Sequence, residues 1–285
     1  MQKNLFVIAL CLLGLTACQN EAADTKSTDT SGMEKTASGY AYELHRDEEG
    51  DPPATGFMTV FDLKQRFDDT LVYSSTERGR KERIVMPTQA SMRGKPSPVI
   101  EMLQMLSAGD SASLYIPFDS LGPNREPWQE QRDYLIYEIS VSHITDLKEA
   151  ENTAATATAD LLAGYKAGTL ENLQTTDNGL KYVIVEEGNG PKAEKGKVVS
   201  VDYYGVTVAD GNAFDNSYKR GEAHRFPLGM GRVIKGWDQG IEGMAQGTKA
   251  ALFIPADLGY GASGSPPKIP ADAELMFYID VKEVE

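Results

Sequence analysis

A run of short motifs between residues 198 and 285 constrains the fold of this chain more than any other feature. The motifs mix aromatic and aliphatic residues with glycines, and they are too short and too often interrupted by glycine to be simple core strands. They occupy residues 201–205, 211–217, 226–229, 233–237, 247–250 and 254–261. Together they predict an aromatic-walled pocket that contains one carboxylate and almost no nucleophiles. Such a pocket is what a catalyst of bond rotation needs.

The order and spacing of these motifs resemble those of one known family. Residues from about 179 to 285 resemble an FKBP-type peptidyl-prolyl cis-trans isomerase domain, with no obvious gap between Phe214 and Phe277. The resemblance implies an α+β fold in which an antiparallel β-sheet wraps around one short helix. It also implies an enzyme that isomerises X-Pro bonds, and we set its domain at residues 173–285.

The resemblance implies a role for individual residues. The backbone N–H of Ile234 and the hydroxyl of Tyr260 would hold substrate carbonyls, and Asp215 would lie near the rotating carbonyl with Arg220 as its ion-pair partner. The catalytic residues are therefore expected to be Asp215, Tyr260 and Ile234. The residues expected to bind the substrate around its proline ring are Tyr203, Phe214, Arg220, Phe226, Val233, Trp237, Ile269 and Phe277.

Rotation about an X-Pro bond requires neither a proton transfer nor a covalent intermediate. The barrier is ~18–20 kcal/mol because rotation breaks amide resonance, so a catalyst must bind the twisted amide better than either planar form. No cofactor is expected for this chemistry. A metal site of His and Cys is not expected either, because His45, His143 and His224 lie far apart and have no companion cysteines.

Several of these features also have a plainer interpretation. Phe226 and Val233 would fit a hydrophobic core equally well, and Asp215 alone would fit a turn, so it is the combination that indicates a site. A formal Gly-x-Gly-x-x-Gly occurs at residues 259–264. It runs into Ser265 and two prolines, which cannot open a helix, so a dinucleotide site is excluded.

Three positions depart from the usual pattern of the family. His224 stands where many relatives have an aromatic residue, Ser265 where a histidine is frequent, and Lys268 where an aliphatic residue is usual. All three are expected on the rim of the pocket. There they would affect the affinity for macrolides and the residue preferred before proline, not the basic activity.

Residues 39–147 repeat the order of strands and turns expected in the C-terminal domain. Residues 112–122 echo residues 250–259, and Val99-Ile100 echoes the pair at 233–234. We therefore expect two FKBP-like domains, of which the first has diverged. The alternative is an unrelated small β-rich domain with a similar pattern of strands.

The repeat has lost the residues that carry the expected chemistry. Tyr73-Ser74 stands where Phe214-Asp215 would, so the carboxylate is absent. No tryptophan occurs between residues 99 and 109, and Trp128 lies in a loop where it cannot replace the pocket floor. The first domain is therefore expected to be inactive.

Residues 148–172 predict a helical linker between the two domains. They are rich in Ala, Glu, Lys and Leu, and Leu161, Leu162 and Tyr165 would share one helical face. We expect this helix to be short and broken near Gly164 and Gly168.

Residues 1–17 have a basic start, a short apolar stretch and a small-residue exit, which is typical of a secretory signal peptide. The apolar stretch, residues 5–15, is too short to span ~30 Å of hydrocarbon as a helix. The exit resembles a bacterial lipobox, so Cys18 is expected to be acylated and to hold the protein on a lipid bilayer. The alternative is an ordinary signal cleaved near Ala17. Residues 18–38 predict a flexible tether.

The net charge of the chain limits the classes of molecule that it is expected to bind. A formal net charge of −14 predicts repulsion from nucleic acid. The expected partners are proline-containing, unfolded or partly folded exported proteins, together with macrolide inhibitors. The leading interpretation is a lipid-anchored foldase of the cell envelope, at the outer membrane and facing the periplasm. The alternative is a non-enzymatic periplasmic chaperone or binding module.

Overall fold

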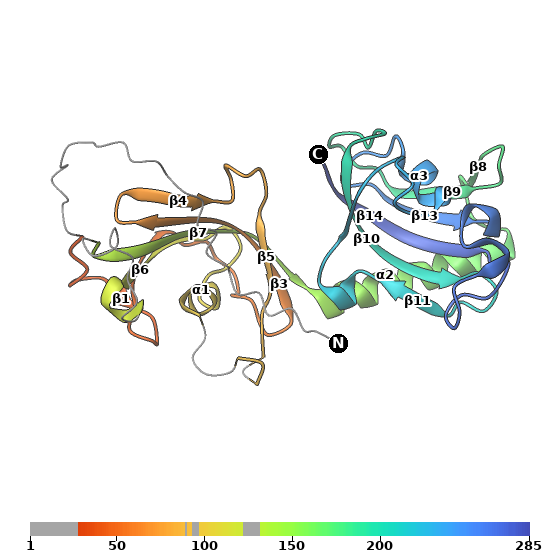
Figure 1. Ribbon diagram of the computed structural model, residues 1–285. Helices are drawn as coiled ribbons and strands as arrows, with labels where there is room; N and C mark the ends of the chain where they lie inside the picture. Colours follow the sequence, from red (N-terminus) through yellow and green to blue (C-terminus); the bar gives the residue numbers. More distant parts are fainter. Residues whose placement is uncertain (1–27, 89, 93–96, 122–131) are drawn as a thin grey trace.

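The computed structural model describes residues 28–88, 90–92, 97–121 and 132–285 (Figure 1). The predicted signal peptide, the lipobox with Cys18 and the first part of the predicted tether lie outside the described residues, as does Trp128. In the described part of the chain, no helix is both long enough and apolar enough to cross a membrane.

Two antiparallel sheets of seven strands follow one another along the chain (Figure 1). The strands of the first sheet are β1 (Glu34–Lys35), β2 (Ala41–Arg46), β3 (Phe57–Phe67), β4 (Thr70–Ser74), β5 (Glu82–Val85), β6 (Ser111–Pro117) and β7 (Tyr134–Asp146). The strands of the second sheet are β8 (Gln174–Thr175), β9 (Lys181–Glu186), β10 (Val198–Thr207), β11 (Ala213–Asn216), β12 (His224–Pro227), β13 (Lys249–Ile254) and β14 (Leu275–Val284).

The two sheets have the same topology. The first has the order β1-β2-β6-β7-β3-β4 with β5 paired to β3, and the second has the order β8-β9-β13-β14-β10-β11 with β12 paired to β10. Every strand of the second sheet therefore takes the place of the strand seven numbers earlier in the first. The predicted α+β fold with two FKBP-like sheets is confirmed.

One short helix packs against each sheet. Helix α1 (Pro98–Leu103) lies on β6, and helix α3 (Lys235–Ile241) lies on β13 (Figure 1). The start of α1 is fixed by Ser97, whose side chain accepts the Ile100 N–H at 3.3 Å, and by the proline that follows it. Val99 and Ile100 thus lie in the first turn of α1, whereas residues 233–234 precede α3. The predicted match between these two pairs is wrong.

Strand β13 is buried along almost its whole length because both of its faces are covered. Leu252 and Ile254 belong to the core between the sheet and α3. Ala251 and Phe253 belong to a second cluster that includes side chains of helix α2 (Leu147–Ala167). Alternate residues of a strand point to opposite faces of a sheet, so the second sheet lies between α3 and α2.

The linker forms one continuous helix, α2, and the predicted break at Gly164 is wrong. The helix begins at Asp146, whose carboxylate accepts two backbone N–H groups of the first turn, and it ends at Gly168, which has a φ of 67°. Gly164 lies inside the last turn, where an added Cβ would come within 2.8 Å of the Leu170 side chain. The glycine therefore lets the chain fold back tightly over the end of the helix.

The outer face of the first sheet carries charges instead of a second core. Along β3, buried Phe61 and Leu63 alternate with Asp62 and Lys64, which point to the other face. Asp62 is paired with Lys81 at 2.9 Å, and Lys64 with Glu138 on β7 at 3.3 Å. Among the described residues the hydrophobic core of this domain lies on the α1 side of the sheet.

Candidate functional site

A cavity of about 430 Å³ opens between α3 and the second sheet. Its walls come from β10, β11, β12 and β14, from the residues that lead into α3, and from the loop between β13 and β14. The residues that line it are Tyr203, Phe214, Asp215, His224, Arg232, Val233, Ile234, Trp237, Tyr260, Ser265, Lys268, Ile269 and Phe277.

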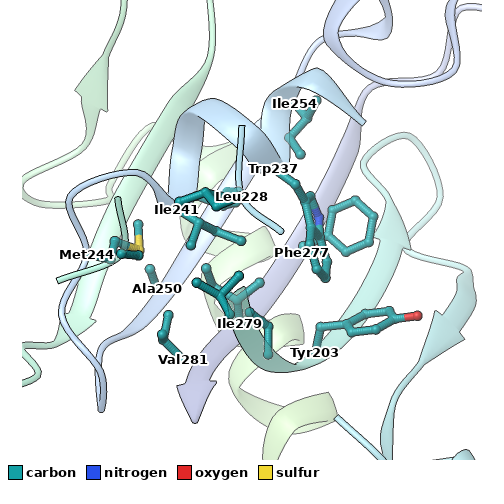
Figure 2. Packing of buried hydrophobic residues seen from close by; sticks show 14 of the residues in the cluster. Tyr203, Leu228, Trp237, Ile241, Met244, Ala250, Ile254, Phe277, Ile279 and Val281 are labelled. Carbon is teal, nitrogen blue, oxygen red and sulfur yellow. The ribbon is translucent and has the colours of Figure 1, made fainter. Parts of the chain in front are cut away.

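Trp237 forms the floor of the cavity. It stands in the first turn of α3 and is only 3% exposed. The rings of Tyr203 and Phe277 meet it at 5.1 and 5.2 Å with interplanar angles of 85° and 84°, the edge-to-face arrangement that aromatic pairs favour. Figure 2 shows Trp237 and Phe277 side by side above Tyr203. Phe226 supports the floor from the core, 5.7 Å from the tryptophan ring.

The aromatic wall depends on the absence of a side chain at Gly205. An added Cβ there would lie 2.8 Å from the Phe277 ring and 2.9 Å from the Phe214 ring. Because glycine leaves this space free, the two rings pack against each other at 5.4 Å and nearly at right angles. A larger residue in this position of β10 would clash with both rings.

Three polar side chains form a closed group at one edge of the cavity. The Tyr203 hydroxyl donates to one oxygen of Asp215, and Arg220 donates to the other oxygen at 2.8 Å. The second guanidinium nitrogen of Arg220 donates to the Tyr203 hydroxyl oxygen at 2.6 Å. The carboxylate is thereby held in one orientation, and its charge is balanced by Arg220.

These contacts also fix the protonation states of the group. Burial alone would raise the pKa of Asp215, but the hydrogen bonds from Tyr203 and Arg220 outweigh it and hold that pKa below its ordinary value. Burial, together with the hydrogen bond to Asp215, raises the pKa of Tyr203 to about 12. At neutral pH, Asp215 is therefore ionised and Tyr203 is protonated.

Several hydrogen-bond donors at the cavity have no partner among the described residues, among them the buried indole N–H of Trp237, the backbone N–H of Ile234 and the Tyr260 hydroxyl. Ile234 precedes α3, and its carbonyl accepts the Trp237 N–H at 2.9 Å while its own N–H is free. Tyr260 is 41% exposed, and its hydroxyl is bonded to no other described group. Burial of the ring, followed by the charge of Asp215, raises the pKa of Tyr260, so its hydroxyl keeps its proton at neutral pH.

The structure brings most of the predicted site residues together. Those that line the cavity are Tyr203, Phe214, Asp215, Val233, Ile234, Trp237, Tyr260, Ile269 and Phe277. Arg220 lies outside the lining and acts on it through Asp215, and Phe226 lies in the core behind Trp237. The catalytic and binding roles of these residues remain predictions. Cys18, predicted to carry the lipid, lies outside the described residues.

The rim of the cavity contains the three departures from the family pattern and one residue that the sequence analysis missed. His224, Ser265 and Lys268 all line the cavity, as predicted from their positions. The missed residue is Arg232, which is exposed and directly precedes the predicted pair Val233-Ile234. Its place next to that pair was the only available signal. No group of three or more metal-ligating side chains occurs in the described parts of the chain.

One hydrogen bond beside this site has an equivalent in the first domain, and it aligns the two domains residue by residue. The Ser75 hydroxyl accepts the Leu63 N–H at 2.9 Å, as the Ser217 hydroxyl accepts the Tyr203 N–H at 3.0 Å. Both serines also donate to an aspartate of the same strand. Leu63 therefore takes the place of Tyr203, and Tyr73 takes the place of the Asp215 carboxylate.

This register corrects the sequence comparison by one residue. Tyr73-Ser74 corresponds to Asp215-Asn216, not to Phe214-Asp215, because the hydrogen bond that fixes the register is invisible in the residue pattern. Gln65 replaces Gly205, so a side chain stands where the second domain needs open space. At the register positions of Tyr203, Asp215 and Gly205, the described part of the first domain thus has Leu63, Tyr73 and Gln65.

A family model and several known proteins match this chain. The family model for FKBP-type peptidyl-prolyl cis-trans isomerase matches residues 190–282. The chain is 47% identical over 94 residues to peptidyl-prolyl cis-trans isomerase FKBP2 of Mus musculus, covering 33% of this chain and 66% of that protein. It is 45% identical over 125 residues to FK506-binding protein 2 of Yarrowia lipolytica, covering 44% of this chain and 85% of that protein. Among solved structures, FkpA from Escherichia coli matches with 32% identity and a TM-score of 0.39, covering 49% of this chain and 62% of that chain.

Proposed function

This chain belongs to the family of FKBP-type peptidyl-prolyl cis-trans isomerases, and we propose that its second domain isomerises X-Pro bonds of polypeptides. The observation that supports this most is an aromatic cavity whose free hydrogen-bond donors include the N–H of Ile234 and the hydroxyl of Tyr260. The cavity binds the proline ring, and the donors hold the carbonyls on either side of it.

The site lowers the barrier by binding the twisted amide more tightly than the planar one. Rotation breaks amide resonance, so the twisted amide is less dipolar and loses less free energy on leaving water. The dry floor of Trp237 and Phe277 favours that state. Asp215 and Tyr203 keep their protonation states throughout, since one pKa lies below and the other well above neutrality. Their part is to shape and polarise the edge of the cavity.

An isomerisation assay on the full chain tests this function. We expect the chain to accelerate cis-trans exchange in a short X-Pro peptide, and FK506 to compete for the same cavity, because the yeast relative carries the name of an FK506-binding protein. Trp237→Phe is expected to keep part of the rate. A chain that is folded and binds FK506 but leaves the exchange rate at its uncatalysed value would refute the proposal.

We propose that the chain acts on exported proteins from a lipid anchor at the outer membrane, facing the periplasm. The support is the pattern at residues 1–18, which has a basic start, a short apolar stretch and a lipobox-like exit at Cys18. Cys18→Ala should release the protein from the membrane fraction of the producing bacterium. Unchanged membrane association of this variant would contradict the anchor.

A second candidate function, holding unfolded clients without catalysis, is favoured by the surface of the first domain. Several of its large apolar side chains are exposed, and Leu71 and Val72 stand next to each other on β4, an edge strand. An exposed edge with apolar side chains suits pairing with an extended peptide. Leu71→Lys together with Val72→Lys should reduce the suppression of client aggregation and leave peptide isomerisation unchanged. Unaltered suppression would argue against this candidate.

A further inference from the structure

Two cations on the rim of the cavity have no acidic partner. Arg232 and Lys268 both line the cavity, and neither forms an ion pair with another described residue. The ammonium group of Lys268 donates to the Phe214 carbonyl at 3.0 Å. That carbonyl is neutral, so it orients the lysine next to the cavity without cancelling its charge.

The acid of the cavity does not neutralise these cations. Asp215 lies 2.8 Å from Arg220 and also accepts the Tyr203 hydroxyl, so its charge is already balanced. His224 contributes no charge at pH 7. Burial, followed by the charge of Arg220, lowers its pKa, so the imidazole is neutral. The cavity thus has a cationic rim on a chain whose net charge is −14.

We propose that this cationic rim selects prolines that have an acidic residue directly beside them, with Lys268 and Arg232 as the specificity-determining residues. The inference rests on the isomerase activity proposed above and names a substrate class for it. A proline ring on the floor of Trp237 leaves its two neighbours at the rim, where the side chains that can meet them include these cations. The acidic surface of the remaining chain repels acidic polypeptides at long range, so the local attraction acts only on a segment already at the cavity.

The expected selectivity is moderate because both cations are exposed. Ion pairs that remain in contact with water are weak, and salt screens them. Two such contacts around a half-enclosed cavity should favour Glu over its neutral isostere Gln by about three- to tenfold in kcat/KM at low ionic strength. The preference should shrink as salt is added.

The test compares Glu with Gln beside proline in short peptides, with the full chain as enzyme. One pair of peptides places Glu or Gln directly before proline, and a second pair places it directly after. In the wild-type chain we expect a Glu/Gln ratio of kcat/KM of about three to ten in at least one pair. In a Lys268→Met and Arg232→Gln double variant the ratio should fall to about one, and Lys268→Arg should keep it.

A Lys192→Met and Lys195→Gln double variant is the matched control, because both are exposed lysines outside the cavity lining and their loss changes the net charge by the same two units. The control should keep the wild-type ratio. An active wild-type chain with a ratio of one or below in both pairs overturns the selectivity and leaves the isomerase function standing. A ratio that survives in the double variant overturns the assignment to these two residues. Absence of isomerisation with every peptide overturns the proposed function itself.

Discussion

The two sheets of this protein share one strand order, but their outer faces are covered differently. On β3, Lys64 and Arg66 face outward and both pair with Glu138, at 3.3 and 3.0 Å. At the same positions of β10, Tyr204 and Val206 lie against α2 in an apolar cluster. The strand order is therefore compatible with either a charged outer face or a second core, because it depends only on the residues that point inward.

The inner faces differ in the residues that carry chemistry. Leu63 and Tyr73 of the first domain are good core and strand residues, and they stand where the second domain has Tyr203 and Asp215. Both sets permit the same hydrogen-bonded strands. The comparison shows that the same strand pairing forms with either set of residues.

Removal of α2 should have the largest effect on stability. It would expose the outer face of the second sheet, which is apolar, whereas the outer face of the first sheet carries charged residues. A chain of residues 173–285 loses Leu162 and Tyr165, which cover Phe253. Burial of large side chains contributes ~1.5–3 kcal/mol each, so we expect unfolding free energy to fall by about 4 kcal/mol or more. Urea denaturation against a chain of residues 147–285 measures this. Equal midpoints for the two chains would show that α2 is only a linker.

The second largest effect is expected from Trp237→Ala, which should affect the second domain and not the first. It removes the floor of the cavity and should cost about 3–5 kcal/mol of stability in the second domain, with loss of most isomerase activity. Ile100→Ala, at the corresponding turn of α1, should destabilise the first domain and leave the activity intact. Thermal melts beside the activity assay give both quantities. Loss of activity in Ile100→Ala would mean that the first domain takes part in catalysis.

Asp215→Asn should act on activity alone. It keeps the shape of the side chain but removes the charge that binds Arg220 and Tyr203. A charged hydrogen bond contributes ~1.5–3 kcal/mol, which corresponds to about ten- to hundredfold in kcat and kcat/KM. Tyr73→Phe, at the equivalent place in the first domain, is the control and should change neither value. A variant Asp215→Asn that melts normally and isomerises at the wild-type rate would show that the carboxylate is structural.

The smallest difference in stability between the domains is expected for the two equivalent serines, Ser75 and Ser217. Ser75→Ala and Ser217→Ala each leave one buried backbone N–H without its acceptor, on Leu63 and on Tyr203. Such a loss costs ~1–3 kcal/mol, and we expect the two values to agree within about 1 kcal/mol. Denaturation of each variant, followed by a probe in its own domain, supplies the comparison. A large cost in one domain and none in the other would contradict the shared register.

The sequence predicted the second domain and most of its cavity because short, specific motifs place those residues on known strands and turns. Nine of the predicted residues line the cavity together. The sequence did not predict the length of α2, since a glycine at 164 favours a break and only the return of Leu170 explains why it is present. Such a contact between segments cannot be read from local composition.

The register of the first domain was also beyond the residue pattern. Tyr73-Ser74 resembles Phe214-Asp215 in having an aromatic residue first, but the hydrogen bond that the Leu63 N–H donates to the Ser75 hydroxyl shifts the match by one residue. Arg232 belongs to none of the apolar motifs, and only the folded structure shows that this charged residue lines the cavity. Specific patterns of apolar residues and glycines predict the fold well. Which charged side chains lie at the rim of the cavity becomes known only from the folded structure.

Both domains share one strand order, and we propose that only the second carries an isomerase site. The most direct test is the isomerisation rate of the full chain with Trp237→Ala and Asp215→Asn combined, with circular dichroism to confirm that both sheets are formed. We expect a rate equal to the uncatalysed exchange, because the first domain has Leu63 and Tyr73 at the positions of Tyr203 and Asp215. A folded double variant that retains a substantial part of the wild-type rate would contradict it and place activity in the first domain.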